Sequence, residues 1–140
     1  GYQTYLLMAG YSQTPLLKKL GIRDDAELYL FQAPDNYKTM VGLPKKVLIR
    51  KNLSEAIDFI HMFVKDQKTF EKEFVRCAEH LKKDGMLWVS WPKKSSKVVT
   101  DLDENKIRDF GLRAGLVDVK VCAVDDTWSG LKFVFRLKDR

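Results

Sequence analysis

The sequence predicts a three-layer α/β fold with a mostly parallel sheet that closes with an antiparallel hairpin. Three observations lead to this prediction. Short apolar runs alternate with helical patterns along the chain, which is typical of a parallel sheet covered by helices. The run at residues 57–64 is almost continuously apolar, as expected for a strand covered on both faces. The last two apolar runs, at residues 116–124 and 131–137, are separated only by a turn-rich segment.

Two short helices are expected in the first third of the chain. One spans residues 15–20, with proline at its first position and Gly21 as its stop. The other follows residues 34–36 and ends near Gly42. Each lies beside an apolar run, so each can cover part of the sheet.

The longest helix is expected to begin after its N-cap, Asp66, and to run to about Lys83. Its apolar stripe consists of Phe70, Phe74, Cys77, Ala78 and Leu81. We expect Asp84 and Gly85 to end this helix, so that the following strand starts at Met86.

A fourth helix is expected at residues 104–114, capped by Asp103 or Asp101 and ended by Gly115. The six expected strands cover residues 26–33, 47–50, 57–64, 86–91, 116–124 and 131–137. Residues 51–56 form a short link for a parallel crossover. Either the second strand is very short, or it is antiparallel to the third.

Length and composition favour one globular domain. The chain has 140 residues and is 45% hydrophobic, enough to bury a core without disulfides or metals. We expect a single domain over residues 8–140, with residues 1–7 as an N-terminal extension. Cys77 and Cys122 lie in apolar periodic segments, so we expect two unpaired core cysteines and a reducing, cytoplasmic setting.

The charge pattern argues against two classes of partner. The net charge is +6, but the basic residues are spread along the chain and no RNP-like or arginine-rich motif accompanies them. We therefore expect no specific binding of nucleic acid. No apolar run has the length of a membrane span, so no membrane partner is expected. The oligomeric state is left open.

The second half of the chain resembles class I methyltransferases, which have a Rossmann-like fold. Residues 81–90 follow the pattern L-K-x-x-G-x-L-x-V-S, which is similar to the fifth-strand signature of those enzymes. Residues 117–137 resemble their closing hairpin. More narrowly, residues 8–22, 84–96 and 115–134 look like an uncharacterised bacterial family of unknown function, which implies a fold and no reaction.

The chain departs from methyltransferases where the cofactor would bind. Those enzymes have a glycine-rich turn after the first strand, whereas residues 31–36 (FQAPDN) contain no glycine. They also end the second strand with an acidic residue that holds the ribose, whereas this strand ends with Arg50 and Lys51. We therefore expect no S-adenosylmethionine in the usual pose, no dinucleotide and no other cofactor.

Polar residues follow several expected strands, at the edge where open α/β sheets hold ligands. Trp88 and Trp91 are expected to face opposite sides of the sheet, and Pro92 to end the strand pairing. The candidate ligand-binding residues are Asp35, Asn36, Lys93, Lys94, Ser95, Ser96, Asp125, Asp126 and Trp128. If the strand at 116–124 is parallel to its sheet, its turn arrives at this edge too.

These residues offer specific chemistry, and each has a structural alternative. Lysines next to hydroxyl groups suit a phosphate or carboxylate, but they also suit a solvated loop. Asp125 and Asp126 can orient a hydroxyl, pair with a lysine, hold a divalent cation or simply start a turn. Trp128 can stack on a base, cover a pocket or pack in the turn. We assign no metal site and no catalytic residue, and we interpret His61 as a core histidine.

The sequence therefore supports three hypotheses. The first is a binding protein without methyltransferase activity, which holds a small anionic or phosphorylated ligand at this edge. The second is a degenerate S-adenosylmethionine-dependent methyltransferase. The third is a non-catalytic subunit that uses the same edge, or an exposed strand, to bind another protein.

Overall fold

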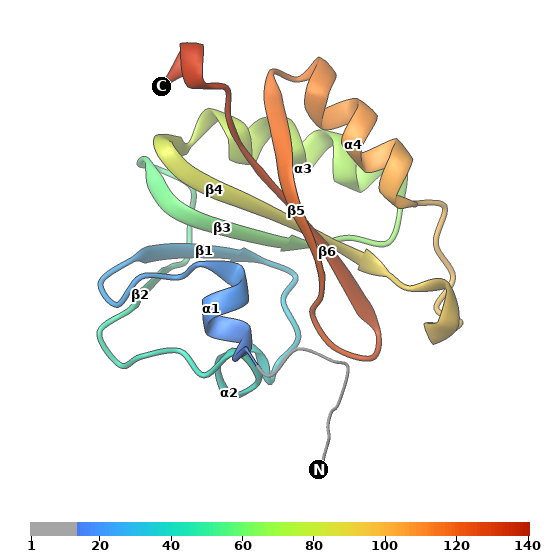
Figure 1. The fold of residues 1–140 in the computed structure, drawn as a ribbon, viewed down its shortest axis with the longest axis horizontal. Helices are drawn as coiled ribbons and strands as arrows, with labels where there is room; N and C mark the ends of the chain where they lie inside the picture. Colours follow the sequence, from blue (N-terminus) through green and yellow to red (C-terminus); the bar gives the residue numbers. More distant parts are fainter. Residues whose placement is uncertain (1–13) are drawn as a thin grey trace.

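The structure is a computed structural model that describes residues 14–140 (Figure 1). Its helices are α1 (Leu16–Leu20), α2 (Tyr37–Val41), α3 (Gln67–Glu79) and α4 (Glu104–Arg113). Its strands are β1 (Glu27–Phe31), β2 (Leu48–Arg50), β3 (Ile57–Phe63), β4 (Leu81–Pro92), β5 (Leu116–Ala123) and β6 (Trp128–Phe135). Two 3-10 turns are η1 (Lys94–Ser96) and η2 (Leu137–Asp139). The expected domain start at Met8 and the extension over residues 1–7 lie outside the described residues.

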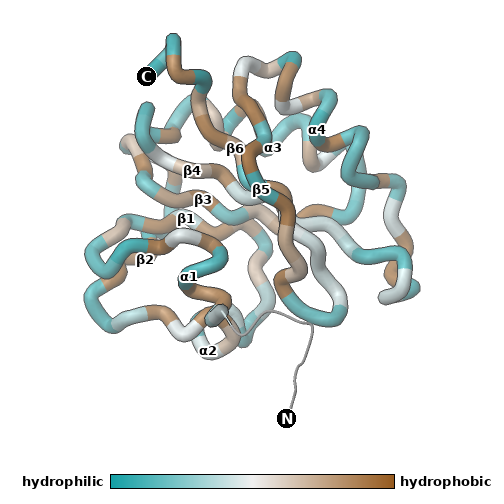
Figure 2. The backbone as a smooth tube through the Cα atoms, in the orientation of Figure 1, coloured by the Kyte–Doolittle hydropathy of each residue, from teal (hydrophilic) through white to brown (hydrophobic). Residues whose placement is uncertain are grey.

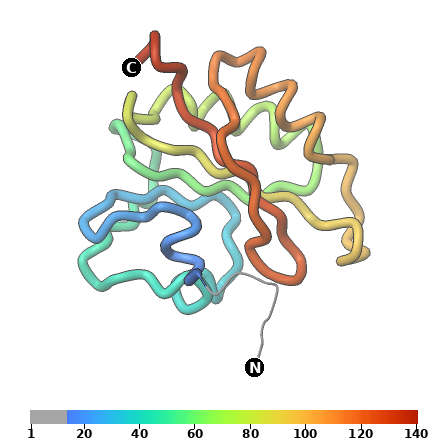
Figure 3. Tube along the Cα trace, viewed as in Figure 1, coloured from blue at the N-terminus to red at the C-terminus, as the bar shows by residue number. Residues whose placement is uncertain are grey.

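The six strands form one sheet in the order β2-β1-β3-β4-β6-β5. Strands β1 to β4 are parallel, and β6 is antiparallel to both of its neighbours, β4 and β5. In Figure 3 the last part of the chain, in red, runs back beside the orange segment before it, and the strand order places it between β4 and β5. The expected α/β fold, with a mostly parallel sheet and a closing antiparallel hairpin, is confirmed.

The short link between the second and third strands is explained by the strand order. Strand β2 pairs only with β1, in parallel, and Arg50 lies level with Tyr29. Strand β3 lies on the other side of β1, where Phe59 is level with Leu28. The link therefore has to pass only one strand, β1, and the end of β2 and the start of β3 differ in level along β1 by only a few residues. Of the two alternatives, the very short strand is correct.

Two apolar clusters lie on opposite faces of the sheet. One contains Phe70, Phe74 and Ile107 from α3 and α4, and the other contains Leu20 and Tyr37 from α1 and α2 (Figure 1). Brown, apolar segments run along the central strands in Figure 2, while the outer turns of α4 are teal. The three layers thus follow from apolar strands covered by two pairs of amphipathic helices.

The two tryptophans of β4 face opposite layers, as predicted. Trp88 belongs to the cluster with α1 and α2, and its indole N–H donates to the carbonyl oxygen of Leu20 at 2.9 Å. Trp91 belongs to the cluster with α3 and α4. This alternation follows from the two-residue period of a strand.

The predicted boundary between the third helix and the fourth strand is wrong. Helix α3 ends at Glu79, and β4 already begins at Leu81. Ile57 pairs with Leu81 and Phe59 with Met86, so residues 82–85 bulge from β4. A Cβ on Gly85 would lie 2.7 Å from the carbonyl oxygen of Asp58. This glycine therefore allows close backbone approach and does not end a helix.

The predicted start of the last strand is also wrong. Strand β6 begins at Trp128, not at Leu131, and Gly130 lies within it, opposite Ser90. A Cβ on Gly130 would lie 3.1 Å from the Trp88 ring, so the missing side chain makes room for that ring. The turn is held by Asp125, whose Oδ1 accepts from the backbone N–H groups of Thr127 and Trp128, both at 2.8 Å.

Candidate functional site

Strand ends from both halves of the chain meet at one edge of the sheet, which we call the carboxyl edge. The parallel strands β1, β3 and β4 end there. Because β6 is antiparallel to both neighbours, the turn between β5 and β6 lies there as well, with Trp128 paired to Pro92. The backbone N–H of Lys93 donates to the carbonyl oxygen of Thr127 at 2.8 Å. The conditional prediction that this turn reaches the carboxyl edge is confirmed.

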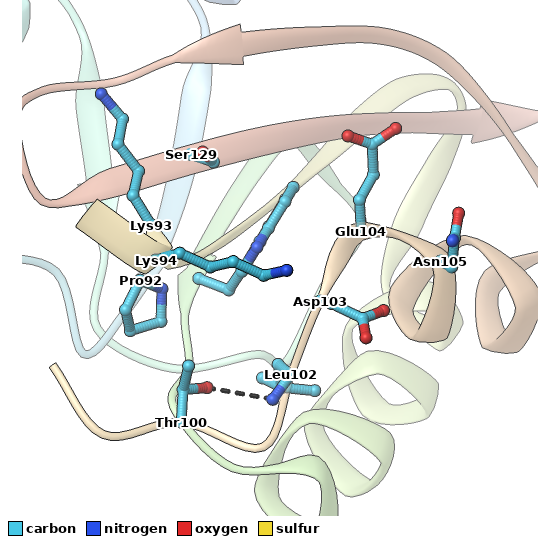
Figure 4. Close-up of a pocket in the computed structure, with 10 residues that line it drawn as sticks. Pro92, Lys93, Lys94, Thr100, Leu102, Asp103, Glu104, Asn105 and Ser129 are labelled. Atoms are coloured by element: carbon cyan, nitrogen blue, oxygen red, sulfur yellow. Dashed lines mark hydrogen bonds between the residues drawn. The ribbon is translucent and has the colours of Figure 1, made fainter. Parts of the chain in front are cut away.

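A hollow of about 400 Å³ lies beyond the end of β4 (Figure 4). We call it the lysine hollow. It is lined by Trp91, Pro92, Lys93, Lys94, Thr100, Leu102, Asp103, Glu104, Asn105 and Ser129. These residues come from the end of β4, the segment before α4, the first turn of α4 and the start of β6. Its walls therefore come from three separate parts of the chain.

The two lysines of this hollow point in different directions. Figure 4 shows Lys94 extending across the hollow toward Asp103, whereas Lys93 extends away from Asp103. Within residues 14–140, neither lysine takes part in an ion pair, in which nitrogen and oxygen atoms are at most 4.0 Å apart. Lys94 is exposed, so its ammonium group is accessible to a ligand.

The two carboxylates of the hollow already have partners. Asp103 is the N-cap of α4, and its Oδ1 accepts from the backbone N–H of Lys106 at 2.8 Å. Glu104 pairs through Oε2 with Arg108. Arg108 also binds Asp118 on β5 at 2.8 Å, which fixes the guanidinium between the helix and the strand. These contacts hold the acidic wall in place.

A second hollow, of about 460 Å³, lies where the strand order reverses between β1 and β3. We call it the switch hollow, because ligands of open α/β sheets bind at such reversals. It is lined by Gln32, Pro34, Phe63, Lys65, Asp66 and Trp128. The Thr100 hydroxyl of the lysine hollow donates to the carbonyl oxygen of Lys65 at 2.5 Å. This hydrogen bond links a residue of one hollow to a residue of the other.

The turn after β1 has an unusual backbone conformation. Gln32 has a φ of 53°, in the left-handed region that favours glycine. Pro34, two residues later, has no backbone N–H to offer a ligand. The side chain of Gln32 and the ring of Pro34 thus occupy the turn in which a methyltransferase would have glycines.

The nine candidate residues are distributed over different places. Lys93 and Lys94 line the lysine hollow. Trp128 lines the switch hollow, where its ring packs edge-on against the Phe63 ring with the two ring centroids 5.1 Å apart. Asp35 lines a third hollow, beside α2, which shares Gln32 and Pro34 with the switch hollow.

The remaining candidates line none of these three hollows; they are Asn36, Ser95, Ser96, Asp125 and Asp126. Two of them have structural contacts. Ser96 donates to the carbonyl oxygen of Lys93 at 2.6 Å and accepts from the N–H of Val98 at 3.2 Å. Asp125 holds the β5–β6 turn. Asn36, Ser95 and Asp126 are exposed.

The acidic wall of the lysine hollow, Asp103 and Glu104, is not among the candidate residues predicted from the sequence. Asp103 was predicted only as a possible helix cap, and Glu104 only as the first residue of a helix. A signal was present, because residues 93–103 join a parallel strand to the next helix and must start from the carboxyl edge. The helix N-terminus that follows is therefore close to that edge.

His61 is fully buried, and its interpretation as a core histidine is confirmed. Its Nδ1 is 2.8 Å from the Tyr37 hydroxyl, and its Nε2 is 2.7 Å from the Ser90 hydroxyl. Burial lowers the pKa of His61 to about 3, so the ring is neutral at neutral pH. The same burial raises the pKa of Tyr37. His61 lines neither the lysine hollow nor the switch hollow.

Two further observations concern metals and membranes. In residues 14–140, no three His, Cys, Asp or Glu side chains are grouped so that they could hold a metal ion. None of the helices in this part of the chain has the length and apolar character needed to cross a bilayer.

The fold is similar to solved structures of methyltransferases. Precorrin-6y C5,15-methyltransferase from Geobacter metallireducens has a TM-score of 0.60 at 11% identity, covering 86% of each chain. Ribosomal protein L11 methylase from Lactobacillus delbrueckii has a TM-score of 0.58 at 9% identity, covering 86% of this chain and 74% of that one. A DhpI–SAH complex has a TM-score of 0.57 at 10% identity, covering 85% and 81%. At these identities the similarity establishes the methyltransferase-like fold alone.

Sequence comparison gives a family without an assigned activity. None of the curated proteins matches the chain. A family model matches residues 17–137, which is most of the sequence and all of the sheet. The chain belongs to the family described as "Protein of unknown function (DUF3052)".

Proposed function

We propose that this protein binds a small molecule with a phosphate or carboxylate group at the lysine hollow, and that it is not an active methyltransferase. The observation that carries this proposal is the state of Lys94. Its ammonium group extends across a hollow and is in no ion pair within residues 14–140. The acids of the same hollow each have a partner already.

The surroundings of Lys94 support an anionic ligand. An ammonium group forms charge-assisted hydrogen bonds with phosphate or carboxylate oxygens. Ser129 and Asn105 line the same hollow and offer hydroxyl and amide donors. The volume of about 400 Å³ lies within the range of small-molecule sites. Lys93, which also lines the hollow, adds a second positive charge. The two unpaired cysteines fit the cytoplasmic location that we propose.

A degenerate methyltransferase is the second candidate, and the switch hollow favours it. This hollow lies at the reversal of strand order, in a fold shared with methyltransferases. The residues there do not fit the usual adenosyl pose, because Gln32 and Pro34 replace a glycine turn. At the end of β2, Arg50 pairs with Glu27 at 2.7 Å, so a cation stands where a ribose-binding acid would be. We therefore place this function second.

A thermal-shift panel tests the proposal. The compounds are phosphate, sugar phosphates, nucleotides, S-adenosylmethionine, S-adenosylhomocysteine and magnesium. They are applied to the wild type and to Lys93→Ala/Lys94→Ala. A ligand at about 100 times its Kd stabilises the folded protein by roughly 2.7 kcal/mol, which shifts the Tm by several degrees. We expect an anionic compound to raise the Tm of the wild type but not that of the double variant.

The chain offers a matched control, because Pro-Lys-Lys occurs twice. Lys45 and Lys46 follow Pro44 just before β2, are exposed, and lie outside the lysine hollow. Lys45→Ala/Lys46→Ala removes the same charge and should keep the wild-type response. If both double variants lost the Tm shift to the same extent, the anions would be attracted to the positive charge of the protein nonspecifically. A shift with adenosyl compounds alone, in all variants, would favour the methyltransferase and refute the proposal.

A further inference from the structure

The lysine hollow has walls of opposite charge, which is more than an anion site requires. Lys94 extends from the side of β4, and Asp103 and Glu104 lie on the side of α4 (Figure 4). Lys94 extends toward the segment that carries Asp103, whose carboxylate turns toward α4, and the two residues are not among the ion pairs of residues 14–140. The space between the two charges is part of the hollow.

Asp103 has one carboxylate oxygen to spare. Its Oδ1 is occupied by the backbone N–H of Lys106 at 2.8 Å. In the part of the chain that the structure describes, Oδ2 accepts no hydrogen bond. The cap fixes the carboxylate in place and leaves one oxygen without a partner within residues 14–140, on a residue that lines the hollow. Glu104 adds negative charge to the same wall and is itself held by Arg108.

The floor between the charged walls is apolar. Trp91 and Leu102 line the hollow, and each is only 6% exposed. A ligand with charged groups at both ends and a short carbon skeleton between them matches this arrangement. A ligand with an anionic group alone would lie in the same hollow as the Asp103 carboxylate, which costs free energy through like-charge repulsion.

We propose that the ligand of this hollow is zwitterionic, with an ammonium group that binds Asp103 and a carboxylate or phosphate that binds Lys94. The class is that of amino acids and phosphorylated amino alcohols or amino acids. This inference rests on the proposed function, since it assigns a second recognition element to the same hollow. It names Asp103 as the residue that selects ligands with an amine.

Matched pairs of compounds isolate the amine. L-Alanine and L-lactate differ by an ammonium in place of a hydroxyl group at the same configuration, and so do O-phospho-L-serine and 3-phospho-L-glycerate. Titration calorimetry with each compound gives Kd values for the wild type. We expect the amine-bearing member to bind about tenfold more tightly in at least one pair, as a hydrogen bond between charged groups allows. Comparison of the two pairs distinguishes a carboxylate from a phosphate ligand.

Two variants assign the effect to residues. Asp103→Asn removes the negative charge but keeps a side-chain oxygen for the Lys106 N–H, so α4 stays capped. It should abolish the preference for the amine and leave the affinity for lactate or phosphoglycerate equal or higher. Lys94→Ala should weaken both members of the pair by about tenfold, because it removes the partner of the group that they share.

The outcomes separate this inference from the proposed function. If anions bind through Lys94 with no preference for amines and no effect of Asp103→Asn, the zwitterion is refuted and the anion site stands. If none of the four compounds binds and the panel of anions gives no shift, both are refuted. A preference for amines that survives Asp103→Asn would also refute the role of Asp103.

Discussion

At the scale of single residues, glycine shows how tertiary contacts override a local signal. Gly21 ends α1 with a φ of 80°, as the sequence predicts. Gly85 and Gly130 look like turn residues in the sequence but lie within strands. They are glycine because Asp58 and Trp88 come too close for a side chain. Since those neighbours come from other strands, no local pattern could distinguish the two uses.

Gly111 in α4 gives a direct test of this kind of contact. A Cβ there would lie 2.1 Å from Cε1 of Phe133 on β6. Glycine to alanine usually stabilises a helix by about 1 kcal/mol. Here we expect Gly111→Ala to destabilise the protein by about 1–3 kcal/mol, because the methyl group overpacks the contact with the sheet.

Chemical denaturation of four proteins would measure this effect. The wild type, Gly111→Ala, Phe133→Leu and the double variant form a thermodynamic cycle. In the Phe133→Leu background, Gly111→Ala should be neutral or stabilising, since the clashing ring is gone. An equal loss of stability in both backgrounds would show that the ring is not the cause.

The buried His61 predicts a dependence of stability on pH. Its pKa is about 3 in the folded protein and 6.5 when exposed, so below pH 6.5 the unfolded chain binds a proton that the folded protein does not. Stability contributed by the neutral ring is therefore present above pH 6.5 and is lost as the pH falls toward 3. From pH 7 to pH 5, we expect this residue to reduce the free energy of unfolding by about 2 kcal/mol.

A variant that lacks the hydrogen-bonded group of Tyr37, His61 and Ser90 isolates the contribution of His61 to the pH dependence. Tyr37→Phe/His61→Leu/Ser90→Ala replaces all three hydrogen-bonded groups with apolar ones, so no buried polar group is left unpaired. Both proteins keep His80, so its effect cancels in the comparison. Urea denaturation at pH 7, 6 and 5 should give a steeper loss for the wild type. Parallel curves would mean that His61 does not control the pH dependence.

At the scale of elements, local signals predicted helix ends better than they predicted the site. Asp66 caps α3 by accepting from the N–H of Thr69 at 2.9 Å, and Asp103 caps α4. Asp101, the other candidate cap for α4, instead accepts from the N–H of Gln67 at the start of α3. A cap needs only a few consecutive residues, so the sequence contains it. The lysine hollow needs β4, β6 and α4 together, so the local signals that predict the caps do not identify its acidic wall; only the topology of the link from β4 to α4 points to it.

The cap of α4 can be tested separately from ligand binding. Asp103→Ala removes the acceptor of the Lys106 N–H and should destabilise the protein by about 1 kcal/mol. Asp103→Asn should be close to neutral, because asparagine caps about as well as aspartate. Thermal denaturation of the three proteins without ligand measures this. If asparagine proved as harmful as alanine, the charge would matter to folding and Asp103→Asn would be unsuitable for the binding test.

At the scale of the whole molecule, the two edges of the sheet are protected in different ways. Strand β2 has only three residues, so it offers little backbone for pairing. Strand β5 has eight, with Val119 and Val121 54% and 52% exposed. The register with β6 shifts between Asp118 and Lys120, so β5 is bulged at Val119. A bulge and a lysine on an edge both discourage pairing with another chain.

Removing the lysine should weaken this protection. Lys120→Val would give β5 a more apolar, more strand-forming edge, so we expect the variant to associate at concentrations where the wild type does not change in mass. Sedimentation velocity over a range of concentrations measures this. Lys138→Val, in the exposed turn η2, makes the same change in charge and hydropathy away from the sheet. Equal association of both variants would point to general loss of solubility instead of edge pairing.

The position of β6 between β4 and β5 also determines which strand pairs can form first while the chain is being synthesised. On the ribosome, β4, α4 and β5 emerge before the strand that joins them. Until residues 128–135 follow, the side of β4 that pairs with β6 is open, and α4 lacks Phe133 beneath Gly111. A nascent chain at that stage exposes an apolar strand edge of the kind that chaperones protect. The part of the sheet that borders the lysine hollow, where β6 pairs with β4, is therefore the last to be completed during translation.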